Sequence, residues 1–360
     1  MKNSITTLEI NNFKSVKHLK LDCKRINVFI GEPNVGKSNI LESLSLFSAS
    51  HYNPTHRLLS NQIRFERVGN LFFDQDRSHN ISVFTDIGGA MLRFQKDTHD
   101  SYELILGPDS EFMQQFSDGT NYNAYQQFSI RGATDDRFLG KPIKPFIVNF
   151  TSDQNPVSNS PRYTNPFRRY IFNANVKESN PFSAFLAPPY GENLYSILEH
   201  NPKLYEECSG FFSKYGLDLL IDTQTNKLEV QKRVGNRVYK IPYALAADTL
   251  QRIIFHFAAI ETNNDSVLVF EEPEAHSFPK YISMFADKVI ASANNQFFIA
   301  THSPYLLTPF IEQCDPKDIA IFVCTYKNYE TKARALSDKE IGNIMESGID
   351  LFFNIDAFKE

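Results

Sequence analysis

Two short strings of this chain contain the residue types that bind nucleoside triphosphates and assist their hydrolysis. Residues 31–38 read G-E-P-N-V-G-K-S and match the phosphate-loop pattern G-x-x-x-x-G-K-[ST]. The glycines let the backbone fold tightly, so that N–H groups surround the phosphates. Lys37 brings a positive charge to the β- and γ-phosphates, and the Ser38 hydroxyl can ligate Mg²⁺. The predicted nucleotide-binding residues of this loop are Gly31, Asn34, Gly36, Lys37, Ser38 and Asn39.

The second string carries two adjacent carboxylates. Residues 267–276 read V-L-V-F-E-E-P-E-A-H, which predicts a buried strand that ends in Glu271 and Glu272. We expect Glu271 to hold Mg²⁺ and Glu272 to orient and deprotonate the attacking water. His302 follows another apolar run, in F-F-I-A-T-H-S-P, and is placed to contact the γ-phosphate. The sequence therefore predicts Mg²⁺-dependent ATP hydrolysis, with Lys37, Glu272 and His302 as catalytic residues and with Ser38 and Glu271 as metal ligands.

A GTPase is the competing interpretation of the same loop. P-N-V-G-K-S resembles the first motif of translational-type GTPases, residues 86–89 (D-I-G-G) match D-x-x-G, and residues 226–229 (N-K-L-E) resemble N-K-x-D. However, the last string ends in Glu, lies late in the chain and reads like a turn between two strands. Asn39 also stands where these GTPases usually carry Thr. Nucleotide preference separates the two interpretations.

The periodicity around these strings predicts the elements that must position them. The phosphate loop follows an apolar strand and precedes an amphipathic helix, as such a loop requires. The middle, residues 107–200, has weak periodicity and is interpreted as irregular and partly helical. We expect strands over residues 5–10, 18–22, 26–30, 80–106 (three antiparallel strands with a glycine pair at 88–89 in a turn), 217–241 (a hairpin), 267–270, 296–300 and 319–324. We expect helices over residues 37–47, 193–215 (two), 248–261 and 281–293.

Composition excludes several classes of protein. The chain has 360 residues, of which 42% are apolar and 22% charged, so it is neither disordered nor fibrous as a whole. A net charge of −5 argues against coating nucleic acid through bulk charge. The four cysteines are far apart and form no metal-binding pattern. Because we find no signal peptide and no run near the roughly 18 apolar residues of a membrane span, we expect a cytoplasmic protein without a membrane partner.

Taken together, the motifs resemble a known group of ATPases. E-E-P-E-A-H, T-H-S-P and the N-terminal N-F-K-S-V-K resemble the ABC-type ATPase heads of the OLD, RecF and SMC group, and more closely the bacterial "AAA family ATPases" related to OLD nucleases. The resemblance implies an α/β, ABC-ATPase-like P-loop fold, with a mixed sheet, an antiparallel first part and an inserted helical subdomain. It implies Walker A at residues 31–38, Walker B at Glu271 and Glu272, a D-loop over residues 274–276 and His302 as the switch histidine. The implied parts are residues 1–110 (lobe I), 111–245 (insertion with a β hairpin) and 246–360 (lobe II).

One motif departs from the group. These heads carry an L-S-G-G-like signature, which opens a helix and touches the γ-phosphate of the partner subunit. Here residues 245–252 read L-A-A-D-T-L-Q-R, so Asp248 and Thr249 are the candidates for that contact. Asp248 has an alternative role as the helix N-cap. The Q-loop glutamine has three candidates, Gln126, Gln127 and Gln154.

The resemblance also implies partners. We expect a homodimer or higher homo-oligomer that sandwiches ATP. Relatives of the OLD type often carry a TOPRIM nuclease domain, and this chain ends at Glu360 soon after the second lobe, so we expect a separately encoded effector in anti-phage defence. A RecF-like, ATP-gated DNA-binding protein is the alternative. Two clusters of cations and aromatics are candidate DNA contacts: Arg162, Tyr163, Phe167, Arg168, Arg169 and Tyr170; and Lys232, Arg233, Arg237, Tyr239 and Lys240.

Overall fold

The central layer of the protein is a six-stranded sheet that is mostly parallel. We describe a computed structural model over residues 1–49, 58–96, 101–107, 146–151, 165–176 and 183–359. The strand order is β15–β14–β3–β13–β12–β8, and only β15 runs antiparallel to its neighbour. Every residue of β3 and β13 is buried, as expected for strands covered on both faces. The strands are β3 (Ile26–Ile30), β8 (Phe167–Tyr170), β12 (Val267–Glu271), β13 (Gln296–Ala300), β14 (Ile319–Lys327) and β15 (Glu330–Ala335).

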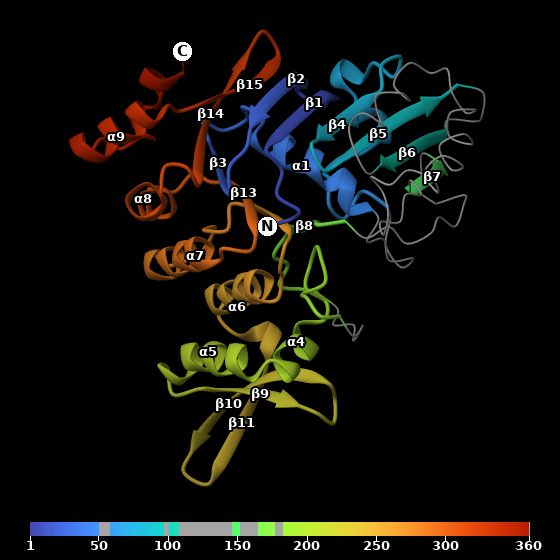
Figure 1. Cartoon of the computed structure of the whole chain (residues 1–360). Coiled ribbons are helices and arrows are strands. Elements are labelled where there is room, and N and C mark those ends of the chain that lie inside the picture. The colour runs from blue at the N-terminus through green and yellow to red at the C-terminus, as the bar shows by residue number, and fades with distance from the viewer. Residues whose placement is uncertain (50–57, 97–100, 108–145, 152–164, 177–182, 360) are drawn as a thin grey trace.

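A second, antiparallel sheet covers one face of the central layer and extends to the right in Figure 1. Helix α1 (Lys37–Ser48) contacts both sheets, so its apolar residues join one core with both of them. The glycine pair at 88–89 lies in β5, not in the preceding turn as the sequence suggested, and residues 86 and 87 form that turn. In order, the sheet comprises β2 (Val16–Asp22), β1 (Thr7–Phe13), β4 (Ile81–Thr85), β5 (Gly88–Gln95), β6 (Ser101–Gly107) and β7 (Phe146–Thr151).

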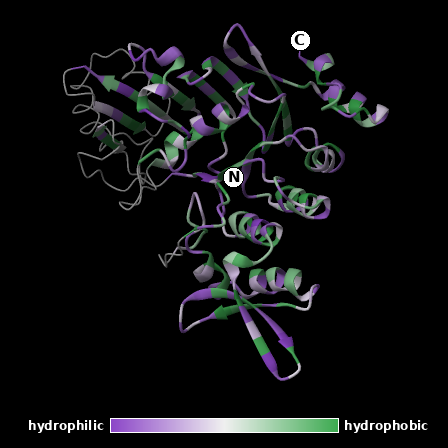
Figure 2. Cartoon of the chain, turned by 180° about the vertical axis from the view of Figure 1, so that it is seen from behind, coloured by the Kyte–Doolittle hydropathy of each residue, from purple (hydrophilic) through white to green (hydrophobic). Residues whose placement is uncertain are grey.

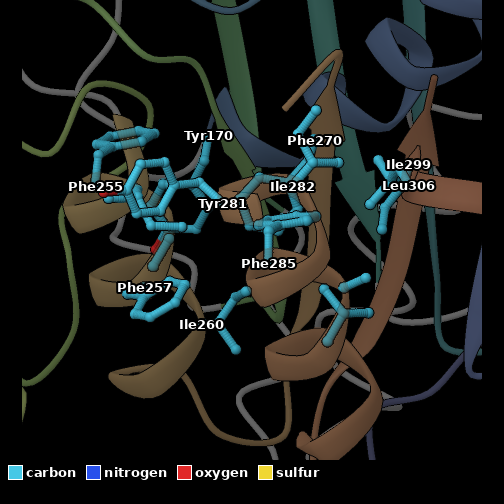
Figure 3. Close-up of a cluster of buried hydrophobic side chains, with 14 of the residues drawn as sticks. Tyr170, Phe255, Phe257, Ile260, Phe270, Tyr281, Ile282, Phe285, Ile299 and Leu306 are labelled. Carbon is cyan, nitrogen blue, oxygen red and sulfur yellow. The ribbon is translucent and has the colours of Figure 1, made fainter. Parts of the chain in front are cut away.

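Helices cover the opposite face of the central sheet and form a core rich in aromatic residues. In Figure 3, side chains of β12, α6 and α7 point toward one another, among them Phe270, Phe255 and Phe285. The ring centroids of Phe270 and Phe285 lie 5.4 Å apart, and the rings are edge to face, an arrangement that aromatic pairs prefer. The helices of this half are α4 (Leu194–His200), α5 (Pro202–Ser213), α6 (Asp248–Glu261), α7 (Pro279–Ala291), α8 (Pro304–Gln313) and α9 (Asp338–Ser347).

A small antiparallel sheet forms the lower end of the molecule in Figure 1. It comprises β9 (Asp218–Asp222), β10 (Lys227–Val234) and β11 (Arg237–Pro242), and it packs on α5 through β9. Every residue of β11 is exposed. Figure 2 shows hydrophilic and hydrophobic residues mixed along this hairpin. Within the described part of the chain, no helix is both long enough and apolar enough to cross a membrane.

The α/β fold with a mixed sheet, expected from the sequence, is confirmed. The interpretation of residues 107–200 was incomplete, because β7 and β8 lie there and pair with strands of the two main sheets. Helices α8 and α9 and strand β15 were also missed. The division at residues 110 and 246 remains a proposal, in which the middle part donates β8 to the central sheet. The three candidate Q-loop glutamines lie outside the described residues.

Candidate functional site

The phosphate loop connects β3 to α1, and its backbone leaves no room for larger residues. Gly36 has a φ of 92°, and a Cβ there would lie 1.9 Å from the Thr331 hydroxyl oxygen. A Cβ on Gly31 would lie 2.6 Å from the carbonyl oxygen of Cys324. Asn34 also has a positive φ, 63°, which asparagine tolerates better than most residues. The loop therefore folds tightly because glycine stands at its two closest approaches to β14 and β15.

Lys37 lies inside this loop. Its ammonium donates hydrogen bonds to the carbonyl oxygens of Gly31, at 3.0 Å, and Glu32, at 2.9 Å. The side chain is nearly buried, and burial lowers the pKa of Lys37 below its ordinary value while nearby carboxylates oppose that shift. A cation held in this position faces the space that the loop encloses, so an anion is the complementary ligand.

Glu271 ends β12 beside the loop, and positively charged side chains hold its carboxylate. Arg64 donates to Oε1 at 2.7 Å, and Arg169 donates to Oε2. The Ser38 hydroxyl lies close enough to this carboxylate to lower its pKa. Burial would raise the pKa of Glu271, but these partners keep the pKa below its ordinary value. An ionised carboxylate in contact with the loop serine is the donor pair that Mg²⁺ prefers. The predicted metal ligands, Ser38 and Glu271, are thus brought together and fit that ion.

A buried carboxylate, Glu42 of α1, supports the same arginines. Its side chain is fully buried, and it accepts hydrogen bonds from Lys14 and from Arg64, the latter at 2.9 Å. Arg169 approaches it to 3.7 Å. Sequence reasoning missed Glu42, Arg64 and this role of Arg169. Glu42 is the one acidic residue of α1 and directly follows Ile40 and Leu41 of its apolar face, which was the available signal.

Glu272 and His302 face each other across the ends of β12 and β13. Glu272 Oε1 lies 3.5 Å from His302 Nε2, and both side chains are partly exposed. Glu272 adopts a φ of 45°, and its N–H donates to the carbonyl oxygen of Ala300 at 2.9 Å. Burial, followed by the Lys37 charge, lowers the pKa of His302, so its imidazole is neutral near pH 7. The pair is positioned by the pairing of two adjacent parallel strands.

Glu274 fixes the backbone that carries His302. Its Oε1 accepts from the Thr301 hydroxyl at 2.5 Å and from the His302 N–H at 2.9 Å. Burial raises the pKa of Glu274. This contact was not predicted from the sequence, which assigned residues 274–276 to a D-loop by resemblance.

These residues surround one cavity of about 810 Å³ at the carboxyl ends of the parallel strands. Ligands of open α/β sheets bind at this edge. The lining includes Asn34, Gly36, Lys37, Ser38, Asn39, Glu271, Glu272 and His302 of the predicted site, together with Ser15, Arg64, Tyr170, Phe172, Arg252, His256 and Tyr326. Asn39 donates to the Ser15 hydroxyl at 2.7 Å, which ties α1 to the turn between β1 and β2.

Asp248 and Thr249 do not line this cavity. They begin α6, where Asp248 pairs with Arg252 at 2.6 Å and Thr249 donates to the carbonyl oxygen of His276 at 2.9 Å. The N-cap of α6 is Ala247, and no side chain caps the helix, so the capping role considered for Asp248 was wrong. Within one chain, the loop and the start of α6 are therefore separate.

The structure separates the two clusters that were candidate DNA contacts. Arg168 and Arg169 do not form an exposed DNA contact, because β8 is buried between β12 and α1 and Arg168 bonds Asn263 and Ser266. Arg162 and Tyr163 lie outside the described residues. The cations of the second cluster are exposed on the β10–β11 hairpin.

Neither GTPase string contributes to the cavity lining. Asp86 accepts hydrogen bonds from the N–H and hydroxyl of Thr6, both at 2.9 Å, in the turn before β5. Asn226 lies in the turn between β9 and β10 with a φ of 53°. Both residues have the local roles of ordinary turns, so these strings give no support to a GTPase.

Comparisons with known proteins identify a family and several similar proteins. The chain matches the family described as "AAA ATPase domain" over residues 1–180 and 248–307. A Helicobacter pylori (strain ATCC 700392 / 26695) protein named "ATP/GTP phosphatase" is 20% identical over 342 residues, 88% of this chain and 90% of that protein.

Among solved structures, the Smc head bound to the C-winged helix domain of ScpA is 15% identical, with a TM-score of 0.48 over 93% of this chain and 99% of that one. An Smc head with an extended coiled coil, bound to the C-terminal domain of ScpA derived from Pyrococcus furiosus, is 14% identical, with a TM-score of 0.47 over 95% and 98%. The family match covers two thirds of the sequence and includes the phosphate loop, Glu271, Glu272 and His302. The chain thus belongs to the AAA ATPase domain family and is an ATPase.

Proposed function

We propose that the cavity binds ATP with Mg²⁺ and hydrolyses it through the residues predicted from the sequence. The observation that carries the proposal is the convergence of Lys37, the Ser38–Glu271 contact and the Glu272–His302 pair on one cavity. Backbone N–H groups between Gly31 and Asn39, with Asn34 and Gly36 at the turn, surround the phosphates. Lys37 exchanges its two carbonyl partners for phosphate oxygens. Ser38 and Glu271 would hold the Mg²⁺ ion, which would supply positive charge that offsets the negative charge of the phosphates.

Glu272 is the proposed general base. Its carboxylate is half exposed, so water reaches it, and the strand end fixes it beside the γ-phosphate position. It orients the attacking water and accepts its proton as the water oxygen bonds to the γ-phosphorus and the bond from that phosphorus to the bridging oxygen breaks, which releases ADP. His302, as a neutral imidazole, has one N–H to donate to a γ-phosphate oxygen. Glu274 keeps the His302 backbone in place through two hydrogen bonds.

Two matched variants test this mechanism. Glu272→Gln should retain ATP binding and lose turnover by about 10²- to 10⁴-fold, because the amide cannot accept the proton. Lys37→Ala should lose tight ATP binding. Glu346→Gln, which changes an exposed carboxylate on α9, is the control and should behave as wild type. Equal turnover in wild type and Glu272→Gln would refute the assignment of the base.

We further propose that two copies sandwich ATP, with Asp248 and Thr249 of one copy facing the cavity of the other. The start of α6 supports this proposal, since both residues are at the surface and lie outside their own cavity. A carboxylate near a γ-phosphate is repulsive, so Thr249 and the free N–H groups of the helix start would make the contact. Glu272→Gln mixed with ATP should double in mass in light scattering, and a mass unchanged by ATP would exclude the sandwich.

The biological setting remains a proposal that rests on the sequence resemblance. We propose a cytoplasmic ATPase related to OLD nucleases that controls a separately encoded effector, such as a TOPRIM-type nuclease, in anti-phage defence. A RecF-like DNA-binding protein is the second candidate, and the exposed cations Lys232, Arg233 and Arg237 favour it. Co-purification of Glu272→Gln with ATP from the native host distinguishes them, since a nuclease supports the first and DNA supports the second.

A further inference from the structure

Strand β14 continues beyond its pairing with β3 and extends along the phosphate loop. It pairs with β3 from Ile319 to Val323 and with its antiparallel partner β15 from Phe322 to Lys327. Side chains two residues apart on a strand share a face, so Cys324 and Tyr326 point the same way. Cys324 lies against the loop, because a Cβ on Gly31 would be 3.3 Å from its Cβ. The face of β14 that carries Tyr326 is therefore the face of the loop.

The pairing with β15 places Tyr326 independently. Tyr326 is directly opposite Thr331, and residues directly opposite on antiparallel strands project to the same face. The Thr331 hydroxyl lies 2.6 Å from that of Ser15 and abuts Gly36. Ser15 in turn accepts a hydrogen bond from Asn39. These contacts fix the β14–β15 hairpin against the start of α1, and they agree that Tyr326 faces the cavity, which it lines.

The two walls of the cavity have different chemistry. Ser38 faces Glu271, which marks the end of the cavity suited to the metal and the γ-phosphate. Asn39, the next residue and about 100° further round the helix, faces Ser15 instead. Tyr326 lines the cavity on this second wall and is 48% exposed, so part of its side chain is accessible to a ligand. An aromatic face beyond the phosphates is suited to a planar ligand group.

We propose that Tyr326 is the stacking platform for the nucleobase of the bound nucleoside triphosphate. The inference rests on the proposed function, since it assigns the base end of the same ligand. Ring stacking contributes to binding without reading the hydrogen-bonding edge of a base. The contribution should therefore be similar for ATP and GTP and absent for a triphosphate without a base.

Calorimetric titration with ATP, GTP and inorganic tripolyphosphate, each with Mg²⁺, tests this proposal. Tyr326→Ala should raise the Kd for both nucleotides by about 5- to 150-fold, the range for loss of one stacked base. The Kd for tripolyphosphate should be unchanged, which also shows that the loop remains folded. Tyr326→Phe should bind like wild type. Tyr329→Ala removes a more exposed tyrosine of the same hairpin, outside the cavity lining, and should leave all three constants unchanged.

The outcomes separate this proposal from the proposed function. If wild type binds neither nucleotide nor tripolyphosphate, the proposed function is wrong. If wild type binds all three and Tyr326→Ala leaves the nucleotide constants unchanged, there is no stacking at Tyr326. If Tyr326→Ala weakens the binding of tripolyphosphate as much as the binding of ATP, the residue supports the loop and does not contact the base. Lys37→Ala should weaken all three ligands, which provides the opposite pattern for comparison.

Discussion

Arg169 is the buried cation on which the geometry of Glu271 depends, and its replacement by methionine is the most informative single change. The guanidinium side chain is 3% exposed. It donates to the Gln62 carbonyl oxygen and to Glu271, and it lies 3.7 Å from Glu42. Methionine has a similar length, so Arg169→Met removes the charge and the donors while it keeps most of the packing.

The size of the effect follows from burial. Removal of one partner from a buried ion pair costs about 3–5 kcal/mol, because the remaining charge stays without water. Arg64 continues to reach both carboxylates, but its side chain is 69% exposed, and exposed pairs contribute little. With the retained packing, we expect a loss near the lower limit, about 3 kcal/mol in the free energy of unfolding. Such a loss is a substantial part of the 5–15 kcal/mol typical of folded proteins.

Urea unfolding followed by circular dichroism measures this loss. Arg237→Met, on the exposed strand β11, is the matched control and should change stability by less than about 0.5 kcal/mol. The double variant Glu42→Gln with Arg169→Met should lose less than the sum of its parts, with a coupling of about 1 kcal/mol or more. A loss for Arg169→Met as small as that for Arg237→Met would refute the reasoning.

The same variant should change the acid side of the stability curve. The folded pKa of Glu271 lies below its ordinary value of 4.5, since its cationic partners and Ser38 outweigh burial. A depressed carboxylate pKa contributes stability above pH 4.5, and this contribution is lost as the pH falls through the folded pKa. In Arg169→Met the pKa of Glu271 rises, so the fall in stability below pH 4.5 should be smaller than in wild type.

Three further substitutions test other contacts. Gly36→Ala should lower the free energy of unfolding, measured in urea, by about 3 kcal/mol, because φ is positive there and the new Cβ would collide with a threonine hydroxyl. Gly210→Ala in helix α5 has open space around it and should stabilise the protein slightly. His256→Phe should flatten the loss of stability between pH 6.5 and 3, since burial lowers the pKa of this histidine to about 3 and the unfolded chain binds its proton first. Glu274→Ala should lower kcat about 10- to 100-fold in a steady-state assay with little change in ATP binding, because His302 loses its backbone anchor.

Local pattern was sufficient for much of the fold. The strand over residues 26–30 and the helix over residues 248–261 have the predicted bounds, because apolar periodicity and polar ends mark them clearly. Helix α8 was missed, since Pro304 begins it and Pro309 lies inside it. Helix α9 carried a usable signal, a capping box in which Ser337 and Glu340 satisfy each other's backbone N–H groups.

Strand β8 shows where local pattern fails. Two adjacent arginines between aromatic residues read as an exposed cationic segment, yet Arg169 is buried. Its burial depends on Glu271, which is 102 residues away in the sequence, and on Glu42 of α1. The residues next to Arg169 in the sequence include neither carboxylate. Local sequence therefore does not show what offsets the free-energy cost of burying this cation. The network around Glu271 therefore became visible only when the strand order was known.

The strand order also explains which motifs meet and which do not. Strand β13 lies between β3 and β12, so His302 follows a strand that separates the loop from the carboxylates. Parallel strands end at the same edge of a sheet, and the three motifs converge there although they are far apart in the chain. The start of α6 is not tied to that edge in the same way. A helix that packs against the face of a sheet can begin at a distance from the edge where the parallel strands end. Asp248 and Thr249 lie outside the cavity of their own chain for this reason, and the proposed sandwich with a second copy is the arrangement that would bring them to a nucleotide.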